Sequence, residues 1–387
     1  MDKRKVGIIF LTILIYIIST GASFALFSKS VETKKNIASP LPSASKSIDA
    51  VVFDQTLPKT EQCPLNGAMY SKQQKDWWAQ HRPLGIMIEN HEEARPQSGL
   101  SSADVVYEAV AEGGITRFLA VYYCQDAGQV GPVRSARTYF LDFISEYGAN
   151  PLYTHVGGAN APGPADALSQ IESYDWGNYN DLNQFSIGFP TFWRDYDRLG
   201  HTVATEHTMY STTAKLWDFA AKSRKLTNVD VEENPWDAKF VTYSFKDDSP
   251  SKTPQVVHLA FWKGYDKYFA DWIYDPATNL YKRNSGGTPH LDKDNNQQLS
   301  AKNVVVLSMI ESNADDGYEN NLHLLYKTKG SGKASIFMDG KEISGRWRKD
   351  TRTARTLLFD SEGNSIKFDR GLIWFEILPT NAEVSVK

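Results

Sequence analysis

The chain opens with its longest apolar run. Residues 6–27 carry no charged side chain, and a basic cluster at residues 3–5 precedes them. About 20 apolar residues are enough to cross a bilayer as a helix, and basic residues before such a helix stay on the cytoplasmic side. The pattern predicts a cytoplasmic segment over 1–5, a single-pass anchor in the cell membrane over 6–27 and an extracytoplasmic body. The alternative is a cleaved signal peptide, although residues 23–25 fit a cleavage site poorly.

A tether and a mixed domain follow this run. Residues 28–62 are rich in Pro, Ser, Lys and Ala and lack apolar periodicity, which predicts a flexible tether. In residues 63–229, runs of strand length alternate with segments of helical periodicity, so we expect a mixed α/β domain. Its main predicted elements are a buried strand at 82–90, a hairpin with strands at 104–112 and 115–123 around Gly113-Gly114, and helices at 132–148 and 211–226.

The remainder of the chain, residues 237–387, has the pattern of a mostly antiparallel β domain. Short apolar runs alternate with turn signals such as Asp339-Gly340. An acidic stretch at 230–236 marks the expected boundary between the two domains. The predicted fold class is therefore α+β: a mixed α/β domain followed by an antiparallel β domain, with an N-terminal transmembrane helix.

The composition and the motifs of the chain narrow the range of possible functions. A net charge of −4 gives no electrostatic reason to bind nucleic acid. The sequence has no G-x-S-x-G elbow, P-loop or dinucleotide fingerprint, and no cofactor is expected. The 10 Trp, 19 Tyr and 19 Phe supply a large core and also stacking surfaces for sugars or peptides. Outside the cytoplasm Cys63 and Cys124 are candidates for a disulfide; two isolated buried thiols are the alternative, and only their distance decides.

The predicted hairpin carries the first candidate catalytic residues. With a two-residue turn, Glu108 and Glu112 share a strand face with Arg117, because strand side chains alternate. The two carboxyl groups are then roughly 13 Å apart, further than the ~5–9.5 Å of paired glycosidase carboxylates. General acid catalysis therefore needs a partner from elsewhere, such as Glu89. The alternative is a cross-strand ladder of ion pairs.

The start of the predicted helix at 132–148 carries a candidate binding site. Arg134 and Arg137 fall in its first turn, where the helix N-terminus is already positive. A bound anion resolves this conflict, and internal salt bridges to the three glutamates named above are the alternative. The candidate ligand-binding residues are Arg117, Arg134, Ser135, Arg137 and, at the end of the first strand, Asn90.

A histidine completes the candidate catalytic set. His155 closes a predicted strand before a glycine-rich loop, a common place for a site residue. A structural histidine is the alternative. No metal site is expected, because the chain has no H-E-x-x-H motif and residues 91–93, a His and two Glu, fit a solvated loop better.

Long stretches of the sequence resemble a known family. "RPLGIMIENHEEARPQSGLSSADVVYEAVAEGGITRFLAVYY" and "VGPVRSARTYFLDFISEYGANPLYTHVGG" resemble the N-terminal domain of the YerB-like family, and "DGKEISGRWRKD" resembles its C-terminal domain. The resemblance covers nearly everything from Cys63 to Pro379. It implies a bacterial envelope location for a family described as lipoproteins, and two domains of unknown function with no catalytic residues to carry over. The chain departs from the lipoprotein pattern, since its apolar run does not end in a cysteine.

Two hypotheses about function follow. The first is a non-catalytic envelope protein that binds peptidoglycan, another envelope polymer or a partner protein. The alternative is a cell-wall glycan-cleaving enzyme that uses a glutamate as general acid. The tether, the aromatic content and the lack of a complete catalytic set favour the first. One glutamate that converges with His155 or Arg137 in an open cleft would support the enzyme. Glutamates that are each neutralised by a buried arginine, with no cavity, would support the binding protein.

Overall fold

The structure, a computed structural model, describes residues 50–387. The predicted basic segment, the anchor at 6–27 and most of the tether lie outside the described residues. Within residues 50–387, no helix has the length and apolar character needed to span a membrane. The last residues of the predicted tether form strand β1 (Lys59–Gln62), which pairs antiparallel with β2 (Met69–Ser71).

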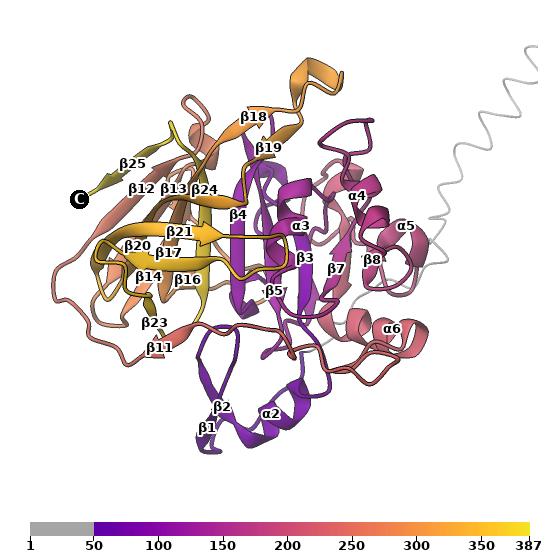
Figure 1. Cartoon of the computed structure of the whole chain (residues 1–387), viewed down its shortest axis with the longest axis horizontal. Helices are drawn as coiled ribbons and strands as arrows, with labels where there is room; N and C mark the ends of the chain where they lie inside the picture. The colour runs from indigo at the N-terminus through magenta and orange to yellow at the C-terminus, as the bar shows by residue number, and fades with distance from the viewer. Residues whose placement is uncertain (1–49) are drawn as a thin grey trace, which may run out of the picture. The chain divides into compact units, whose positions relative to one another are not determined.

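A ten-stranded sheet takes strands from both predicted domains (Figure 1). Its central junction is the parallel pair of β24 and β4, in which residues 373–377 lie beside residues 105–109. One sheet therefore crosses the boundary expected at 230–236, and the domain limits stay a prediction. In order, the strands are β22 (Leu357–Asp360), β21 (Lys341–Lys349), β20 (Gly330–Met338), β17 (Asn303–Met309), β24 (Ile373–Pro379), β4 (Val105–Glu112), β5 (Ile115–Tyr122), β3 (Leu84–Glu89), β7 (Leu152–His155) and β8 (Asp181–Asn183).

Different layers cover the two faces of this sheet. On one face lies α3 (Thr138–Ile144), whose Phe143 stacks on Tyr107 of β4 with ring centroids 4.8 Å apart. On the other face, Trp272 of a second sheet meets Trp374 of β24 edge to face at 5.2 Å. The second sheet consists of β15 (Thr288–Pro289), β14 (Leu280–Ser285), β13 (Ala270–Asp275), β12 (Val256–Ala260) and β25 (Glu383–Val386), with β16 (Ser300–Ala301) paired to β14.

Shorter elements complete the body, and this mostly β architecture with a few helices confirms the α+β class. The helices are α2 (Lys72–Trp78), α4 (Ala167–Ser173), α5 (Gln184–Ile187) and α6 (Thr213–Arg224). The strands are β6 (Gln129–Val130), β9 (Trp193–Arg194), β10 (Met209–Thr212), β11 (Ser244–Lys246), β18 (Glu311–Asn313), β19 (Leu324–Tyr326) and β23 (Lys367–Asp369). The 3₁₀ turns are η1 (Glu92–Ala94), η2 (Leu100–Ser102), η3 (Thr205–His207), η4 (Asp266–Tyr268) and η5 (Glu319–Asn321).

The helix predicted at 132–148 begins later than expected. Helix α3 starts at Thr138, and the residues before it are extended. The backbone N–H of Arg134 donates to the carbonyl of Met87 in β3 at 2.9 Å. Because this segment satisfies its backbone groups against the sheet rather than within a helical turn, the prediction that Arg134 and Arg137 lie in the first turn is wrong. Arg137 is the N-cap residue, and Arg134 precedes the helix.

The predicted hairpin is confirmed, but its register differs from the expected one. Between Val110 and Glu112 the strand has a β-bulge, an extra residue that shifts the pairing by one. Arg117 therefore pairs with Ala109 instead of Val110. Because successive side chains point to opposite faces, Glu108 faces away from Arg117. The prediction that Arg117 and Glu108 share a face is wrong.

A disulfide ties the start of the body to the central sheet. Cys63 and Cys124 are bonded, with Cα atoms 6.0 Å apart and both side chains fully buried, which confirms the candidate bridge. The carboxyl group of Asp104 lies beside it and accepts the backbone N–H groups of Tyr123 and Cys124 at 2.7 and 2.8 Å. Burial raises the pKa of Asp104 to about 7, although these donors act to lower it. Neither thiol is free in the oxidised protein.

Candidate functional site

The carboxylate of Glu112 lies between two arginines at the end of β4. Nη2 of Arg117 is 2.9 Å from Oε1, and Nη2 of Arg137 contacts Oε2. Both arginines are buried, whereas Glu112 is 24% exposed. Burial acts to raise the pKa of Glu112, but the charges of Arg117 and Arg137 outweigh it and lower the pKa to about 2. Glu112 is therefore an ionised partner of two cations and not a proton donor near neutral pH.

Glu89, at the end of β3, forms an ion pair on the same face of the sheet. Its Oε2 lies 2.7 Å from Nε of Arg134 and 3.2 Å from Nδ1 of His207. Burial acts to raise the pKa of Glu89, but the hydrogen bond from His207 and the charges of Arg117 and Arg134 bring it below its ordinary value. Ser135 takes part only through its backbone carbonyl, which accepts from Nη1 of Arg117 at 3.2 Å.

Glu108 lies on the opposite face, between the two sheets. Its Oε2 is 2.6 Å from Nη2 of Arg283, and both side chains are fully buried. Oε1 accepts from the Thr116 hydroxyl at 2.7 Å and from the Asn90 amide at 3.3 Å. Glu376 of β24 pairs with Glu108; burial, reinforced by the negative charge of Glu108, raises the pKa of Glu376 well above its ordinary value. Glu108 and Asn90 therefore belong to the interior.

His155 lies at the end of β7, as predicted, and is fully buried. Its Nε2 is 2.6 Å from the carboxylate of Asp181, and its Nδ1 is 2.6 Å from the carbonyl oxygen of Gly157. Both ring nitrogens are engaged by the protein, and this geometry fits a structural histidine.

Each predicted glutamate thus has a buried or half-buried arginine as its partner. The protein itself supplies the anions that the arginines require, which supports the alternative of internal salt bridges. The catalytic and ligand-binding roles of these residues stay predictions. The pairs are Glu89–Arg134, Glu108–Arg283, Glu112–Arg117 and Glu112–Arg137.

We expect Glu112→Gln to lower the free energy of unfolding at pH 7 by on the order of 3 kcal/mol, because the pKa is lowered from 4.5 to about 2 and each pKa unit corresponds to about 1.4 kcal/mol. A lowered folded-state pKa stabilises above pH 4.5, and this contribution disappears as the pH falls from about 4.5 to 2. The difference between wild type and variant in urea titrations should shrink over that window. A constant difference would contradict the ion pairs; the exposed Glu342→Gln is the control.

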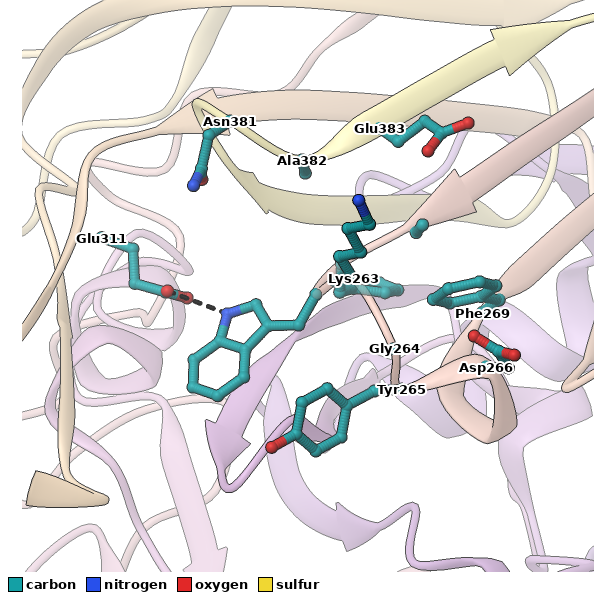
Figure 2. A pocket seen from close by; sticks show the side chains of 12 residues that line it. Lys263, Gly264, Tyr265, Asp266, Phe269, Glu311, Asn381, Ala382 and Glu383 are labelled. Carbon is teal, nitrogen blue, oxygen red and sulfur yellow. Dashed lines mark hydrogen bonds between the residues drawn. The ribbon is translucent and has the colours of Figure 1, made fainter. Parts of the chain in front are cut away.

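Away from these ion pairs, an open pocket of about 680 Å³ lies where the chain after β12 meets the turn before β25 and strand β18 (Figure 2). This volume is in the range of small-molecule sites. Its lining combines aromatic rings with carboxylate, amide and ammonium groups. The residues that line the pocket include Trp262, Lys263, Tyr265, Asp266, Glu311, Asn381 and Glu383.

The aromatic wall of the pocket rests on the tip of the predicted hairpin. Trp262 and Tyr265 meet edge to face with ring centroids 5.6 Å apart, and Tyr265 is 40% exposed. Figure 2 shows Asn381 and Glu383 across the opening from the Tyr265 ring. A Cβ atom at Gly114 would lie 2.2 Å from that ring. The hairpin turn therefore needs glycine here both for its positive φ of 77° and to seat Tyr265.

Glu311 of β18 lies in this pocket with both carboxylate oxygens held by aromatic donors. Trp262 Nε1 donates to Oε1 at 2.9 Å, the dashed line in Figure 2, and the Tyr326 hydroxyl donates to Oε2. Burial raises the pKa of Glu311 above its ordinary value, although both hydrogen bonds act to lower it. The pocket thus has a carboxyl group that is easier to protonate than an exposed one.

Sequence reasoning missed this pocket. The signal was the segment "AFWKGYDKYF", which holds five aromatic residues around a glycine turn, more than a short strand end needs for packing. Glu311 and Asn381 reach the pocket from distant parts of the chain, and no local pattern marks them.

Comparison with known proteins agrees with the fold and leaves the activity open. Residues 67–227 match the family described as "Protein of unknown function (DUF3048) N-terminal domain", and residues 257–375 match the DUF3048 C-terminal domain. The chain is 28% identical over 301 residues to the protein named "Putative lipoprotein YerB" of Bacillus subtilis (strain 168), a match that covers 78% of this chain and 82% of YerB.

The crystal structure of YerB from Bacillus subtilis is similar to this fold, with a TM-score of 0.66 and 25% sequence identity. The match covers 84% of this chain and 99% of that structure. Both domain matches, the sequence similarity and the shared fold agree with the resemblance seen in the sequence. The chain therefore belongs to the YerB-like family, whose paired DUF3048 domains have no established function.

Proposed function

We propose that this protein is a membrane-anchored envelope protein whose extracytoplasmic body binds a cell-envelope glycan, such as peptidoglycan, in the pocket beside Trp262. The observation that carries the proposal is the make-up of that pocket, in which partly exposed Trp262 and Tyr265 stand next to Glu311, Asn381 and Glu383. Sugar rings present apolar C–H faces and hydroxyl edges. Aromatic rings match the faces, and carboxylate and amide oxygens match the hydroxyl groups.

The ion pairs of Glu89, Glu108 and Glu112 support binding rather than catalysis at the hairpin. Glu89 and Glu112 have pKa values below the ordinary range, and Glu108 is sealed between the sheets. None of the three lines the pocket. A general acid needs a proton near neutral pH and access to its substrate. The lowered pKa values of Glu89 and Glu112 fail the first condition, and the full burial of Glu108 fails the second.

The proposed location at the membrane is supported by the sequence and by the family. Residues 6–27 have the length and composition of a membrane anchor, and the similar protein YerB is named a lipoprotein. Cys63 and Cys124 are bonded to each other and therefore have no free thiol for a lipid. We accordingly assign attachment to the apolar run rather than to a lipidated cysteine.

Binding can be tested by cosedimentation of the full-length protein, kept in detergent, with purified peptidoglycan sacculi. We expect Trp262→Ala and Tyr265→Ala to weaken binding about tenfold or more, since truncating a central aromatic contact costs on the order of 2 kcal/mol. Tyr196→Ala is the matched control, because Tyr196 is 55% exposed and lies outside the pocket. Unchanged binding by Trp262→Ala, or an equal loss in Tyr196→Ala, would refute this assignment.

The raised pKa of Glu311 favours one second candidate, a glycan-cleaving enzyme with Glu311 as general acid. The same sacculi distinguish the two functions. Soluble fragments released by the wild type and not by Glu311→Gln would establish the enzyme. Binding without release would support the binding protein.

A further inference from the structure

Two histidines and a glutamate from distant segments converge at the end of β3. His91 and Glu93 lie in the loop and 3₁₀ turn η1 that follow this strand, and His207 closes η3 before β10. The two imidazole rings stack with centroids 4.8 Å apart. One potential ligand atom from each of the three side chains lies within 4.8 Å of the other two. Three side chains of metal-binding types therefore share one small volume outside the pocket.

The two ring nitrogens of His207 face two different carboxylates. Nδ1 is 3.2 Å from the carboxylate of buried Glu89. Nε2, on the other side of the ring, lies 3.8 Å from Oε2 of Glu93. The backbone N–H of Glu93 donates to Nδ1 of His91 at 3.2 Å, which holds the His91 ring next to the same carboxylate. A cation between Nε2 of His207 and Oε2 of Glu93 could contact both atoms. In metal sites, the ring nitrogen of a histidine that does not bind the metal typically contacts a carboxylate, as Nδ1 of His207 contacts Glu89.

We propose that His91, Glu93 and His207 bind one divalent transition-metal ion, with zinc the best match. Zinc takes tetrahedral sites of histidine nitrogen and carboxylate oxygen, and three protein ligands leave a fourth position for water. Glu93 is 56% exposed, so the fourth position opens to solvent. Glu89 acts on the ion through His207 as a positioning residue.

The charges around the cluster suit a cation. Arg134 neutralises Glu89, and the neighbouring Glu92 pairs with Lys267 at 2.6 Å. Glu93 has no arginine or lysine partner among the described residues. The cluster therefore has, next to two imidazoles, a carboxylate without an arginine or lysine partner among the described residues, and a divalent ion would balance its charge.

The sequence concealed this arrangement because its parts are far apart in the chain. A zinc motif is recognisable when two histidines share one helix, whereas here His91 and His207 come from separate turns. The expectation of no metal site rested on the absence of such a motif. The structure assigns the histidines to one place only through the packing of η3 against the end of β3.

The test is zinc titration of the full-length protein, freed of any affinity tag, stripped with EDTA and kept in detergent. Isothermal titration calorimetry should show one zinc per chain. We expect His91→Ala and His207→Ala to weaken zinc binding at least about 100-fold. Glu89→Gln should weaken it about 10- to 100-fold, as is typical of a group that orients a ligand. His201→Ala is the matched control, since His201 is exposed, near in sequence and outside the cluster.

Cobalt substitution gives a second readout that does not depend on stability. Cobalt(II) bound to the wild type should show the visible absorption of a tetrahedral site, and His91→Ala should lose it. His91 is only half-buried, so its replacement tests the site even where His207→Ala fails to fold. Binding of less than about half a zinc per chain at 100 μM free zinc (about ten times a Kd of roughly 10 μM, at which about nine sites in ten would be filled), or equal binding in His91→Ala and His201→Ala, would overturn the proposal.

Discussion

Replacing Glu146 with glutamine is expected to lower the free energy of unfolding by about 3–5 kcal/mol, the cost of breaking a buried ion pair. Glu146 follows α3 and is buried. Its carboxylate is 2.7 Å from both Lys349 Nζ and Arg355 Nη1, and it also accepts the Thr356 hydroxyl at 2.7 Å. Burial acts to raise the pKa of Glu146, but Lys349 and Arg355 bring it below its ordinary value. Glutamine would leave two buried cations without an anion.

Urea unfolding of the full-length protein at pH 7 measures this effect. Glu342→Gln is the control, because Glu342 lies on the same strand as Lys349 but is exposed, and such surface substitutions change stability by about 0.5 kcal/mol or less. A loss below about 1 kcal/mol in Glu146→Gln, against the buried-pair value, would show that Glu146 does not tie the segment after α3 to Lys349 and Arg355 as the contacts indicate.

Removal of the disulfide should have an effect of similar size. Cys63 and Cys124 are 61 residues apart, and closing a loop of that length in the unfolded chain stabilises the native state by about 4 kcal/mol in the chain-entropy description. The Cys63→Ser/Cys124→Ser double variant should therefore unfold at lower urea concentration. Wild type reduced with dithiothreitol in denaturant and then refolded under reducing conditions should match it. A double variant as stable as the oxidised wild type would mean that the bridge does not constrain the unfolded chain.

Local signals in the sequence predicted several elements correctly. Gly113-Gly114 marked the hairpin, because two residues with positive φ suit a tight turn between strands. Helix α6 lies within the helix predicted at 211–226, and Thr212 caps its start, where the Thr212 hydroxyl accepts the N–H of Lys215 at 3.0 Å. The α+β class followed from the change of periodicity along the chain. These features depend on residues that are neighbours in sequence.

The partners of the candidate glutamates could not be predicted in the same way. A single bulged residue, Ala111, reversed the face of Glu108, because a shift of one position turns every side chain of a strand over. Arg283, the partner of Glu108, lies in the other half of the chain. The late start of α3 also moved Arg134 and Arg137 out of a helical turn, since hydrogen bonds to β3 competed with helix formation.

The family was recognisable from long stretches of the sequence. By itself, the sequence also determined the apolar run at 6–27, the hairpin around Gly113-Gly114 and the α+β class. Local hydrogen-bonding propensity, residue volume and hydrophobic periodicity decide these features, and all three can be read along the chain. Only the tertiary structure decided that Glu89 and Glu112 serve as ion-pair partners, that Trp262 and Glu311 share a pocket, and that His91 lies against His207. Such contacts join residues far apart in sequence, and they depend on strand register and layer packing, which a one-residue shift can change.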